Sequence, residues 1–297
     1  MDNDNKRIGF IGAGMVGKSL AVALKNRGYN VAAVASRTYA SAENLAGLVD
    51  SCVAFRDPQA VADACDFVLI TSTDDSIKSV ASSVTWRDGQ GIAHCSGVAS
   101  LDILTSVVGE KVLVGAIHPL QAFSSVDYKQ AALDGTTFAI EGNSDMRAYL
   151  KKIALDLGGR PIFLRPEDKP LYHATVVMMG GILAGMFGHV ADLWSHFGIN
   201  RDEALNAITP IAQSVVTGVN AFGIPQAVAG PYVRGDLGTI KKHVNALRST
   251  APESMEVYCQ MALAGLPYAL EKGNYSEHLA AEIKLVLTSG FEGTDQK

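Results

Sequence analysis

The first twenty residues contain the feature that constrains this chain most, an apolar run that ends in a G-x-G-x-x-G turn and passes directly into a helical pattern. Gly12 permits a tight turn, Gly14 lets the backbone approach a pyrophosphate, and Gly17 lets the helix pack closely on the strand. The amides and positive dipole end of that helix, which starts at Met15 and Val16, then face the phosphates. The order of strand, turn and helix predicts a dinucleotide site. A glycine-rich turn that binds nothing is the alternative.

The segment after the next strand indicates which dinucleotide binds. Residues 30–35 have the pattern of a second buried strand, which completes a βαβ unit. At its end, where an NAD-specific fold places an acidic residue for the ribose 2′-hydroxyl, this chain has Ser36, Arg37 and Thr38. A guanidinium with two hydroxyls suits a 2′-phosphate, so the sequence predicts NADP(H) as the cofactor. The alternative is an ordinary surface arginine at a strand end.

Strand and helix patterns alternate up to about residue 165 and then give way to helical patterns alone. Such alternation is typical of an α/β fold with a doubly wound parallel sheet. We therefore expect a dinucleotide-binding domain over residues 1–165 and an all-α domain for substrate binding and dimerisation over residues 166–297. A chain of 297 residues is long enough to form two hydrophobic cores.

Three strand ends are expected to contribute to one crevice, because doubly wound sheets bind ligands at the carboxyl ends of their strands. The fourth strand ends in Thr71, Ser72 and Thr73, which are predicted to lie near the cofactor. At least one of the two aspartates that follow is expected to cap the next helix. The fifth strand ends near Ser96, a candidate substrate-binding residue. The sixth ends at His118, whose imidazole can exchange a proton at the rim, although a rim histidine without a function is the alternative.

The helical half opens with a lysine and a histidine four residues apart, Lys169 and His173. On a helix this spacing places both side chains on one face, where a cation and an imidazole can polarise a carbonyl or supply a proton. Together with His118 they are the catalytic candidates. The alternative is a solvated lysine and a core histidine without a catalytic role.

A Gly- and Pro-rich loop further along carries candidate substrate-binding residues. Arg234 ends this loop and can clamp a carboxylate with two hydrogen bonds. Asp236 and His243 follow it and complete the candidate set. Arg234 and Asp236 could instead pair with each other and hold the loop in place.

The charge balance excludes some function classes. The chain has 25 Lys and Arg against 30 Asp and Glu and no basic block, so it lacks the electrostatic footprint of a nucleic-acid binder, and a small-molecule partner fits better. Its four cysteines lack C-x-x-C spacing, which argues against a zinc site or a disulfide framework, so no metal is expected. The first residues are polar and acidic, the reverse of a signal peptide, and predict a cytoplasmic protein.

An uncharged stretch over residues 174–191 contains the G-x-x-x-G spacing of membrane helix pairs at Gly181 and Gly185. A membrane span therefore has to be weighed. His189 within the run, the lack of a flanking basic asymmetry and the otherwise α/β chain favour a buried helix between domains or at a dimer interface. We thus expect a homodimer and no membrane association.

Several short motifs together give the chain a family resemblance. In order they are GFIGAGMVG, TSTDD, HCSG, IHPLQAF, KPLYHA and AGPYVRGD, followed by His243. The chain resembles the Rossmann-like oxidoreductases whose helical half is domain-of-unknown-function family 2520. It is also similar to the wider 6-phosphogluconate dehydrogenase-like group, which includes ketopantoate reductases and pyrroline-5-carboxylate reductases. The resemblance implies a Rossmann domain, an all-helical domain, and dimerisation through the helical half.

The resemblance also implies a reaction class. Hydroxyacid members of the group carry a catalytic lysine followed four residues later by asparagine, and Lys169 and His173 stand in this place. We therefore expect an NADPH-dependent reductase of a small carbonyl acid, an oxidoreductase acting on CH–OH, with ketopantoate as the first candidate substrate. In it Lys169 with a histidine would protonate the developing alkoxide, while Ser96 and Arg234 orient the acid. A reductase of a cyclic imine and a noncatalytic NADP(H)-sensing protein are the alternatives.

Overall fold

The computed structural model describes residues 6–123, 133–273 and 275–290. The chain divides into two compact units, Met1–Leu183 and Ala184–Lys297. The strands end where the sequence places the domain boundary, near residue 165, but the compact units divide 18 residues later than that boundary. The reason is that helix α7 (Lys169–Val177) is anchored to the sheet, since Lys169 on it is buried and pairs with Glu141.

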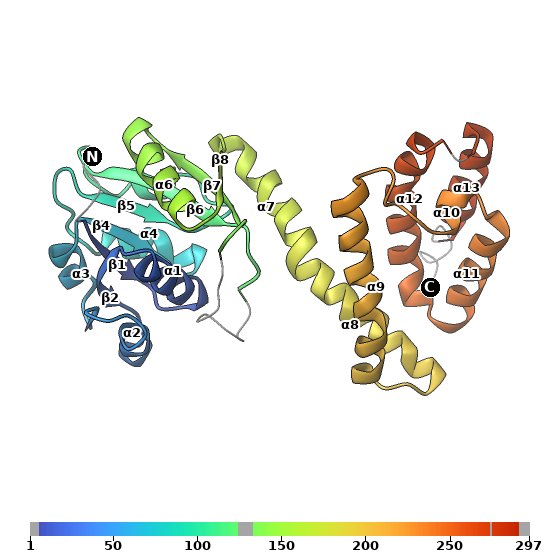
Figure 1. Cartoon of the computed structure of the whole chain (residues 1–297), viewed down its shortest axis with the longest axis horizontal. Helices are drawn as coiled ribbons and strands as arrows, with labels where there is room; N and C mark the ends of the chain where they lie inside the picture. The colour runs from blue at the N-terminus through green and yellow to red at the C-terminus, as the bar shows by residue number, and fades with distance from the viewer. Residues whose placement is uncertain (1–5, 124–132, 274, 291–297) are drawn as a thin grey trace. The chain divides into compact units, whose positions relative to one another are not determined.

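The first unit is built on one eight-stranded sheet with the order β3-β2-β1-β4-β5-β6-β7-β8 (Figure 1). The strands are β1 (Arg7–Ile11), β2 (Asn30–Ala35), β3 (Val53–Phe55), β4 (Phe67–Ile70), β5 (Gly91–His94), β6 (Leu113–Pro119), β7 (Thr137–Gly142) and β8 (Arg160–Phe163). Strand order reverses between β1 and β4, which is where a doubly wound sheet forms its ligand crevice. The predicted fold class, a doubly wound α/β unit followed by helices, is confirmed.

One strand departs from the expected parallel sheet. β7 pairs antiparallel with β6, whereas the other neighbouring strands pair in parallel. A parallel pair needs a long crossover connection, usually a helix. An antiparallel pair has no such requirement, and the register of β6 and β7 shows that the chain returns in the opposite direction. The sequence-based expectation was wrong here because the pattern of an apolar strand does not show its direction.

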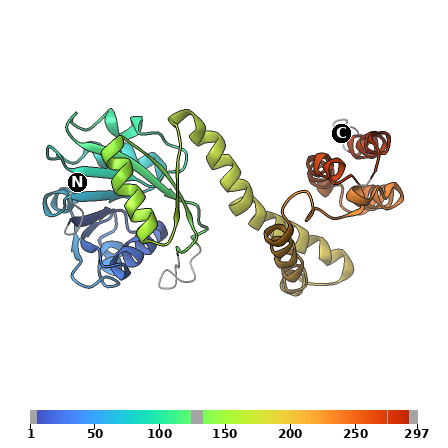
Figure 2. The same ribbon diagram turned by 45° about the horizontal axis from the view of Figure 1, so that its top comes forward.

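Helices cover both faces of this sheet (Figures 1 and 2). They are α1 (Met15–Asn26), α2 (Tyr39–Ala46), α3 (Pro58–Ala64), α4 (Asp74–Ser82), α5 (Asp102–Thr105) and α6 (Ser144–Asp156). One core cluster joins the sheet to α1, α2 and α6, and a second joins it to α3, α4 and α5. The central strands, such as β4 and β5, are therefore buried on both sides, as their continuous apolar runs indicated, whereas the edge strands β3 and β8 are partly exposed.

The start of α4 corrects a smaller expectation. The helix begins at Asp74, with Thr73 at the N-cap position and no side-chain cap hydrogen bond, so neither aspartate is the capping residue. Asp74 and Asp75 lie instead in the first turn. Their carboxylates are favourable there because the positive end of the helix dipole is close.

The second unit is helical. It contains α8 (Leu183–Leu193), α9 (Arg201–Phe222), α10 (Pro231–Arg234), α11 (Leu237–Thr250), α12 (Met255–Glu271) and α13 (Glu277–Ser289). Its core cluster is formed by α11, α12 and α13, through residues such as Ile240, Cys259 and Ile283. The expected all-α second half is present.

The helical run Pro166–Phe197 is long and apolar enough to cross a membrane, by length and composition. The sequence predicts that residues 174–191 are buried between domains or at a dimer interface. Within the units of the described chain only Ala191 of this stretch is buried, so the interface itself stays a prediction. Large apolar side chains point outward, with Met179 73% and Ile182 56% exposed.

Candidate active site

The turn between β1 and α1 has the geometry that a pyrophosphate requires. Gly12 has a φ of +114°, and a Cβ there would lie 2.6 Å from the carbonyl carbon of Thr71. A Cβ at Gly17 would lie 2.6 Å from the carbonyl oxygen of Gly12. A Cβ at Gly14, in contrast, would meet nothing within 4 Å. Two of the glycines are therefore required by the fold, and the third leaves open space in front of the helix.

The neighbouring strand end holds this turn in place. The Thr71 hydroxyl donates a hydrogen bond of 2.7 Å to the carbonyl oxygen of Gly12, and Thr71 is buried. Ser72 and Thr73 follow at the same strand end, as predicted, with the Thr73 hydroxyl 2.9 Å from that of Ser76. The structure thus gives Thr71 a role in positioning the turn.

The first turn of α1 has no side-chain cap, because its N-cap residue is Gly14. The amides at the start of the helix, Met15 and Val16 among them, therefore face the space in front of Gly14 without a competing side chain. Backbone amides and a helix dipole in this arrangement attract an anion. These residues fit the diphosphate of a dinucleotide.

The segment expected to bind a 2′-phosphate, residues 36–38, directly follows β2, and Arg37 and Thr38 are exposed. β3 pairs in parallel with β2, so Arg56, which follows β3, lies at the same edge of the sheet. Its guanidinium stacks on the Tyr39 ring, 4.0 Å from the centroid. Sequence reasoning missed this second cation, although its position directly after a strand could have indicated it.

A buried ion pair lies at the start of α7. The Lys169 ammonium is 3.3 Å from Oε2 of Glu141 on β7, and the two side chains are only 4% and 5% exposed. Burial lowers the pKa of Lys169, and the carboxylates of Glu141 and Asp74 act in the opposite direction. The lysine is therefore not a solvated residue at a helix start. Sequence reasoning missed Glu141, whose only signal is an acidic residue within an apolar strand.

Strand register brings further polar residues onto the same face. Ala116 on β6 pairs with His94 of β5 on one side and with Glu141 of β7 on the other. Residues that face each other across paired strands point to the same side of the sheet, and so does the residue two positions along. His94, Glu141 and His118 therefore share one face, the face that receives Lys169.

His118 forms a pair with Tyr172. Its Nδ1 lies 2.8 Å from the Tyr172 hydroxyl, and its ring centroid is 5.7 Å from that of His173. Burial lowers the pKa of His118 to about 4, with further contributions from His173 and Lys169, while burial raises the pKa of Tyr172. Both shifts keep the imidazole neutral and the tyrosine protonated. In the tautomer in which the Tyr172 hydroxyl donates to Nδ1, the Nε2 of His118 carries the proton and is a neutral hydrogen-bond donor.

Gly97 allows the two imidazoles to come together. A Cβ at this position would lie 2.4 Å from Cδ2 of His173 and 2.9 Å from Nε2 of His118. The predicted catalytic residues Lys169, His118 and His173 thus lie in one cluster of the first unit, together with Tyr172, which sequence reasoning did not select.

Ser96 has a more structural role than expected. It is 4% exposed, and its hydroxyl oxygen accepts hydrogen bonds from the amides of Val98 and Ala99. Its own amide donates to Nδ1 of His94, at 3.1 Å. Burial lowers the pKa of His94 to about 3, and the charge of Lys169 lowers it further, so this histidine is neutral. Ser96 therefore orders the turn after β5 instead of presenting a free hydroxyl.

The remaining substrate-binding candidates belong to the second unit. Asp236 is the N-cap of α11, where its carboxylate accepts hydrogen bonds from the amide and hydroxyl of Thr239. Its hydrogen bonds therefore go to the start of α11, while its interaction with Arg234 is one of charge. Arg234 is the exposed last residue of α10. The pKa of Asp236 is lowered mainly by the hydrogen bonds from Thr239 and to a smaller extent by the positive charge of Arg234.

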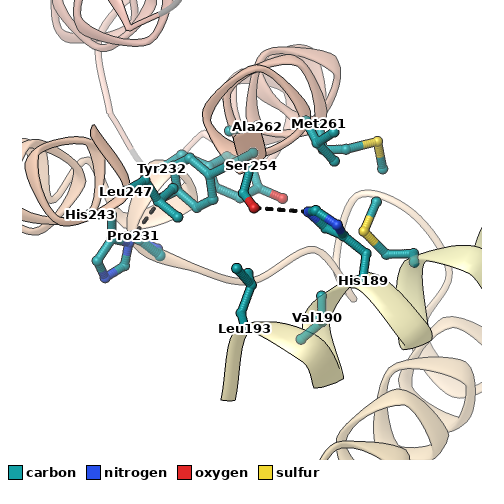
Figure 3. A pocket seen from close by; sticks show the side chains of 13 residues that line it. His189, Val190, Leu193, Pro231, Tyr232, His243, Leu247, Ser254, Met261 and Ala262 are labelled. Atoms are coloured by element: carbon teal, nitrogen blue, oxygen red, sulfur yellow. Dashed lines mark hydrogen bonds between the residues drawn. The ribbon is translucent and has the colours of Figure 1, made fainter. Parts of the chain in front are cut away.

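His243 lines a pocket of about 450 Å³ within the second unit. Two hydrogen-bonded pairs lie in its wall, Ser254 with His189 at 3.0 Å and His243 with Tyr258 at 2.9 Å. Figure 3 shows the Ser254 hydroxyl directed at the imidazole of His189. The lining residues are Met186, His189, Val190, Leu193, Pro231, Tyr232, His243, Leu247, Ser254, Val257, Tyr258, Met261 and Ala262.

Fold and geometry define a two-part protein of the Rossmann type, with an open glycine turn at the point where strand order reverses. In agreement, residues 1–119 match the model of a Rossmann-like domain, and residues 136–264 match the model described as Domain of unknown function (DUF2520). The motif resemblance therefore agrees with two partial matches, a Rossmann-like domain in the first part of the chain and DUF2520 over residues 136–264. The likeness to ketopantoate reductases stays a prediction. No curated protein sequence matches the chain.

Several solved structures share this fold. A protein described as an NADP oxidoreductase, from Bacteroides fragilis, is 22% identical with a TM-score of 0.72, over 89% of this chain and 99% of that one. A 1-pyrroline-5-carboxylate reductase from Streptococcus pyogenes is 16% identical with a TM-score of 0.61, over 97% and 99% of the two chains. A pyrroline carboxylate reductase from Plasmodium falciparum, solved with NADP bound, is 14% identical with a TM-score of 0.61, over 96% and 99%.

Proposed function

We propose that the chain is an NADPH-dependent reductase of a small carbonyl acid, a 2-oxo acid such as ketopantoate. The observation that carries the proposal is the buried pair Lys169 and Glu141 with the partly buried His118, on a sheet whose glycine turn has open space in front of Gly14. Similarity to structures described as NADP oxidoreductases and pyrroline carboxylate reductases supports the reaction class.

The proposed cofactor site uses three parts of the sheet edge. The amides at the start of α1 hold the diphosphate, the open space at Gly14 admits it, and Arg37 with Arg56 binds the 2′-phosphate. NADPH supplies the hydride when it is bound. The chain itself contributes orientation and charge.

The proposed chemistry on the substrate side is charge stabilisation and proton delivery. Reduction of a carbonyl leaves negative charge on oxygen, and a cation or a proton donor must meet it within hydrogen-bond distance. The ammonium of Lys169 is the proposed cation, because burial strengthens its field and Glu141 fixes its position. The neutral Nε2–H of His118 is the proposed second donor.

A reductase of a cyclic imine is the second candidate. Its support is the likeness to pyrroline carboxylate reductases and to a reductive aminase from Aspergillus terreus solved with NADPH. That aminase is 16% identical with a TM-score of 0.56, over 97% of this chain and 95% of that one. Measuring the rate of NADPH oxidation with each of a set of 2-oxo acids and cyclic imines as substrate tests both candidates. Turnover with either class supports reduction, whereas tight NADPH binding without turnover of any of them would favour a sensing protein.

Cofactor preference is the first testable prediction. NADPH should bind at least about tenfold more tightly than NADH, a difference of about 1.4 kcal/mol, because Arg37 can pair with the 2′-phosphate. Arg37→Ala should remove most of this difference, and Arg56→Ala a smaller part. Titration of both cofactors by fluorescence measures it. Lys111→Ala is the control. Lys111 is exposed and precedes β6, so it lies at the amino ends of the strands, away from the carboxyl ends that carry Arg37 and Arg56. Equal affinities in the unmodified protein would contradict the assignment.

Assembly is the second prediction. We propose a homodimer that is cytoplasmic and forms through the helical half, because α9 exposes a stripe of apolar side chains, Ile211, Val215, Val219 and Phe222, besides those of residues 174–191. Light scattering of the full chain without detergent should give about twice the chain mass. Val215→Glu should shift the protein toward the monomer, while Gln213→Glu on the same helix should not. A monodisperse monomer, or a need for detergent, would count against the dimer.

A further inference from the structure

We infer that the pocket of the second unit is a binding site for an uncharged, mainly apolar small molecule that carries one hydrogen-bonding group. The pocket is formed within residues 184–297 and uses none of the residues proposed to bind NADPH. The inference therefore does not depend on the proposed reductase function. Its volume of about 450 Å³ falls within the usual range of about 300–1,000 Å³ for small-molecule sites.

The lining determines the class of ligand. Its thirteen residues include no Asp, Glu, Lys or Arg, and most are aliphatic or aromatic. An ion that entered such a pocket would lose hydration without gaining an opposite charge. An apolar ligand gains instead from burial of its own surface, at about 25 cal/mol per Å².

The polar atoms of the wall define where one polar group would be recognised. In the free protein the imidazole and the hydroxyl of each pair are hydrogen-bonded to each other, in Ser254–His189 (Figure 3) and in His243–Tyr258. An apolar ligand therefore leaves neither pair with a broken hydrogen bond. A hydroxyl and an imidazole can each accept or donate one more bond, so a single ligand hydroxyl has partners at either pair.

The side chains of the pocket wall suit a ligand that contains a planar ring. Tyr232 and Tyr258 present aromatic surface, and Met186 and Met261 present flexible thioethers that adapt to a planar ring. Ala262 is the small residue of the wall and is buried, so a larger side chain there would occupy the cavity. Ala264 lies two residues further along α12, is exposed, and does not line the pocket.

The test compares two probes of the same shape. 2-Naphthol is neutral at pH 7 and has one hydroxyl, whereas 2-naphthoate carries a full negative charge on the same rings. In calorimetry with the full chain, 2-naphthol should bind saturably at one site per chain, and 2-naphthoate should bind at least about tenfold more weakly. Equal binding of the two probes, or unsaturable binding of 2-naphthol, would overturn the assignment of an uncharged ligand site.

Matched substitutions localise the binding. Ala262→Trp should abolish 2-naphthol binding, and Ala264→Trp should leave it unchanged. If Ala262→Trp does not fold, Met261→Trp at the 59% exposed rim is the second variant, with the same expected loss. Retained binding in a folded pocket variant, or loss in Ala264→Trp, shows that the probe binds elsewhere and contradicts the proposal. NADPH affinity should be unchanged in all three variants, so a failure of this site is distinguishable from a failure of the cofactor site.

Discussion

Replacing Lys169 by alanine should lower the turnover of the substrate about a hundredfold or more and leave NADPH affinity nearly unchanged. Loss of an interaction made mainly in the transition state lowers the rate at saturating substrate, and a hundredfold corresponds to about 2.7 kcal/mol. His118→Ala should cost less, because it removes a neutral donor. Steady-state kinetics on the substrate found by the NADPH screen, with an NADPH titration, measure both effects.

The same substitution also has a structural effect that must be separated from the chemical one. Without Lys169, the carboxylate of Glu141 is left buried and unpaired, which typically costs about 3–5 kcal/mol of stability. The double variant Lys169→Ala/Glu141→Gln removes that charge and should regain most of the melting temperature. It should not regain turnover. Recovery of both would show that Lys169 acts only through the fold.

The pH dependence supplies a further readout. Since burial holds the pKa of Lys169 below 10.5, turnover should fall as the pH rises through that lowered pKa, because the ammonium loses its proton. Lys169→Ala should lack this alkaline limb. His118, with a pKa of about 4, should contribute no limb near neutral pH. Near-normal turnover and an unchanged profile in folded Lys169→Ala would refute the assignment and leave the histidines as candidates.

Substitutions of two glycines in the β1–α1 turn should separate binding from folding. Gly14→Val should keep the melting temperature but weaken NADPH binding about a hundredfold, about 2.7 kcal/mol, because its side chain fills the space meant for the diphosphate. Gly12→Ala should instead destabilise the protein, because its φ is +114° and its Cβ would lie 2.6 Å from Thr71. Thermal unfolding and NADPH titration of both variants measure the contrast.

Gly109→Ala is the matched control for these variants, since a Cβ there also meets nothing within 4 Å and the position is remote from the turn in the chain. It should change neither the melting temperature nor NADPH affinity. Unaltered NADPH binding in Gly14→Val would place the diphosphate away from this turn and remove the basis of the cofactor assignment.

Much of the first unit was predictable because its signals are local. The glycine turn, the apolar strands and the residues that follow them are each specified by short segments, whose period and glycine content determine the backbone. Positions 12, 14 and 17 illustrate this, since their backbone geometry agrees with the roles inferred from the pattern. Thr71 follows a strand end as predicted. The sequence did not show that its hydroxyl donates a hydrogen bond to the carbonyl oxygen of Gly12 in the glycine turn.

The cluster around Lys169 shows where local signals stop. The spacing of Lys169 and His173 predicts that they share a helix face. It does not show that Lys169 pairs with Glu141, or that the missing side chain of Gly97 leaves room for the imidazoles of His118 and His173. Those contacts join β5, β6, β7 and α7 through strand register, which no short segment encodes. The Tyr172 hydroxyl pairs with His118 for the same reason.

By itself, the sequence determined the order of the elements, the glycine turn and the candidate residues at strand ends, because each depends on neighbours in the chain. Only the tertiary structure decided the antiparallel direction of β7, the partner of Lys169 and the capping role of Asp236. It also decided that residues 174–190 are not buried within the compact unit to which each belongs. The physical reason is that burial and pairing are set by which segments meet in space, and the strength of an ion pair or a hydrogen bond depends on that environment.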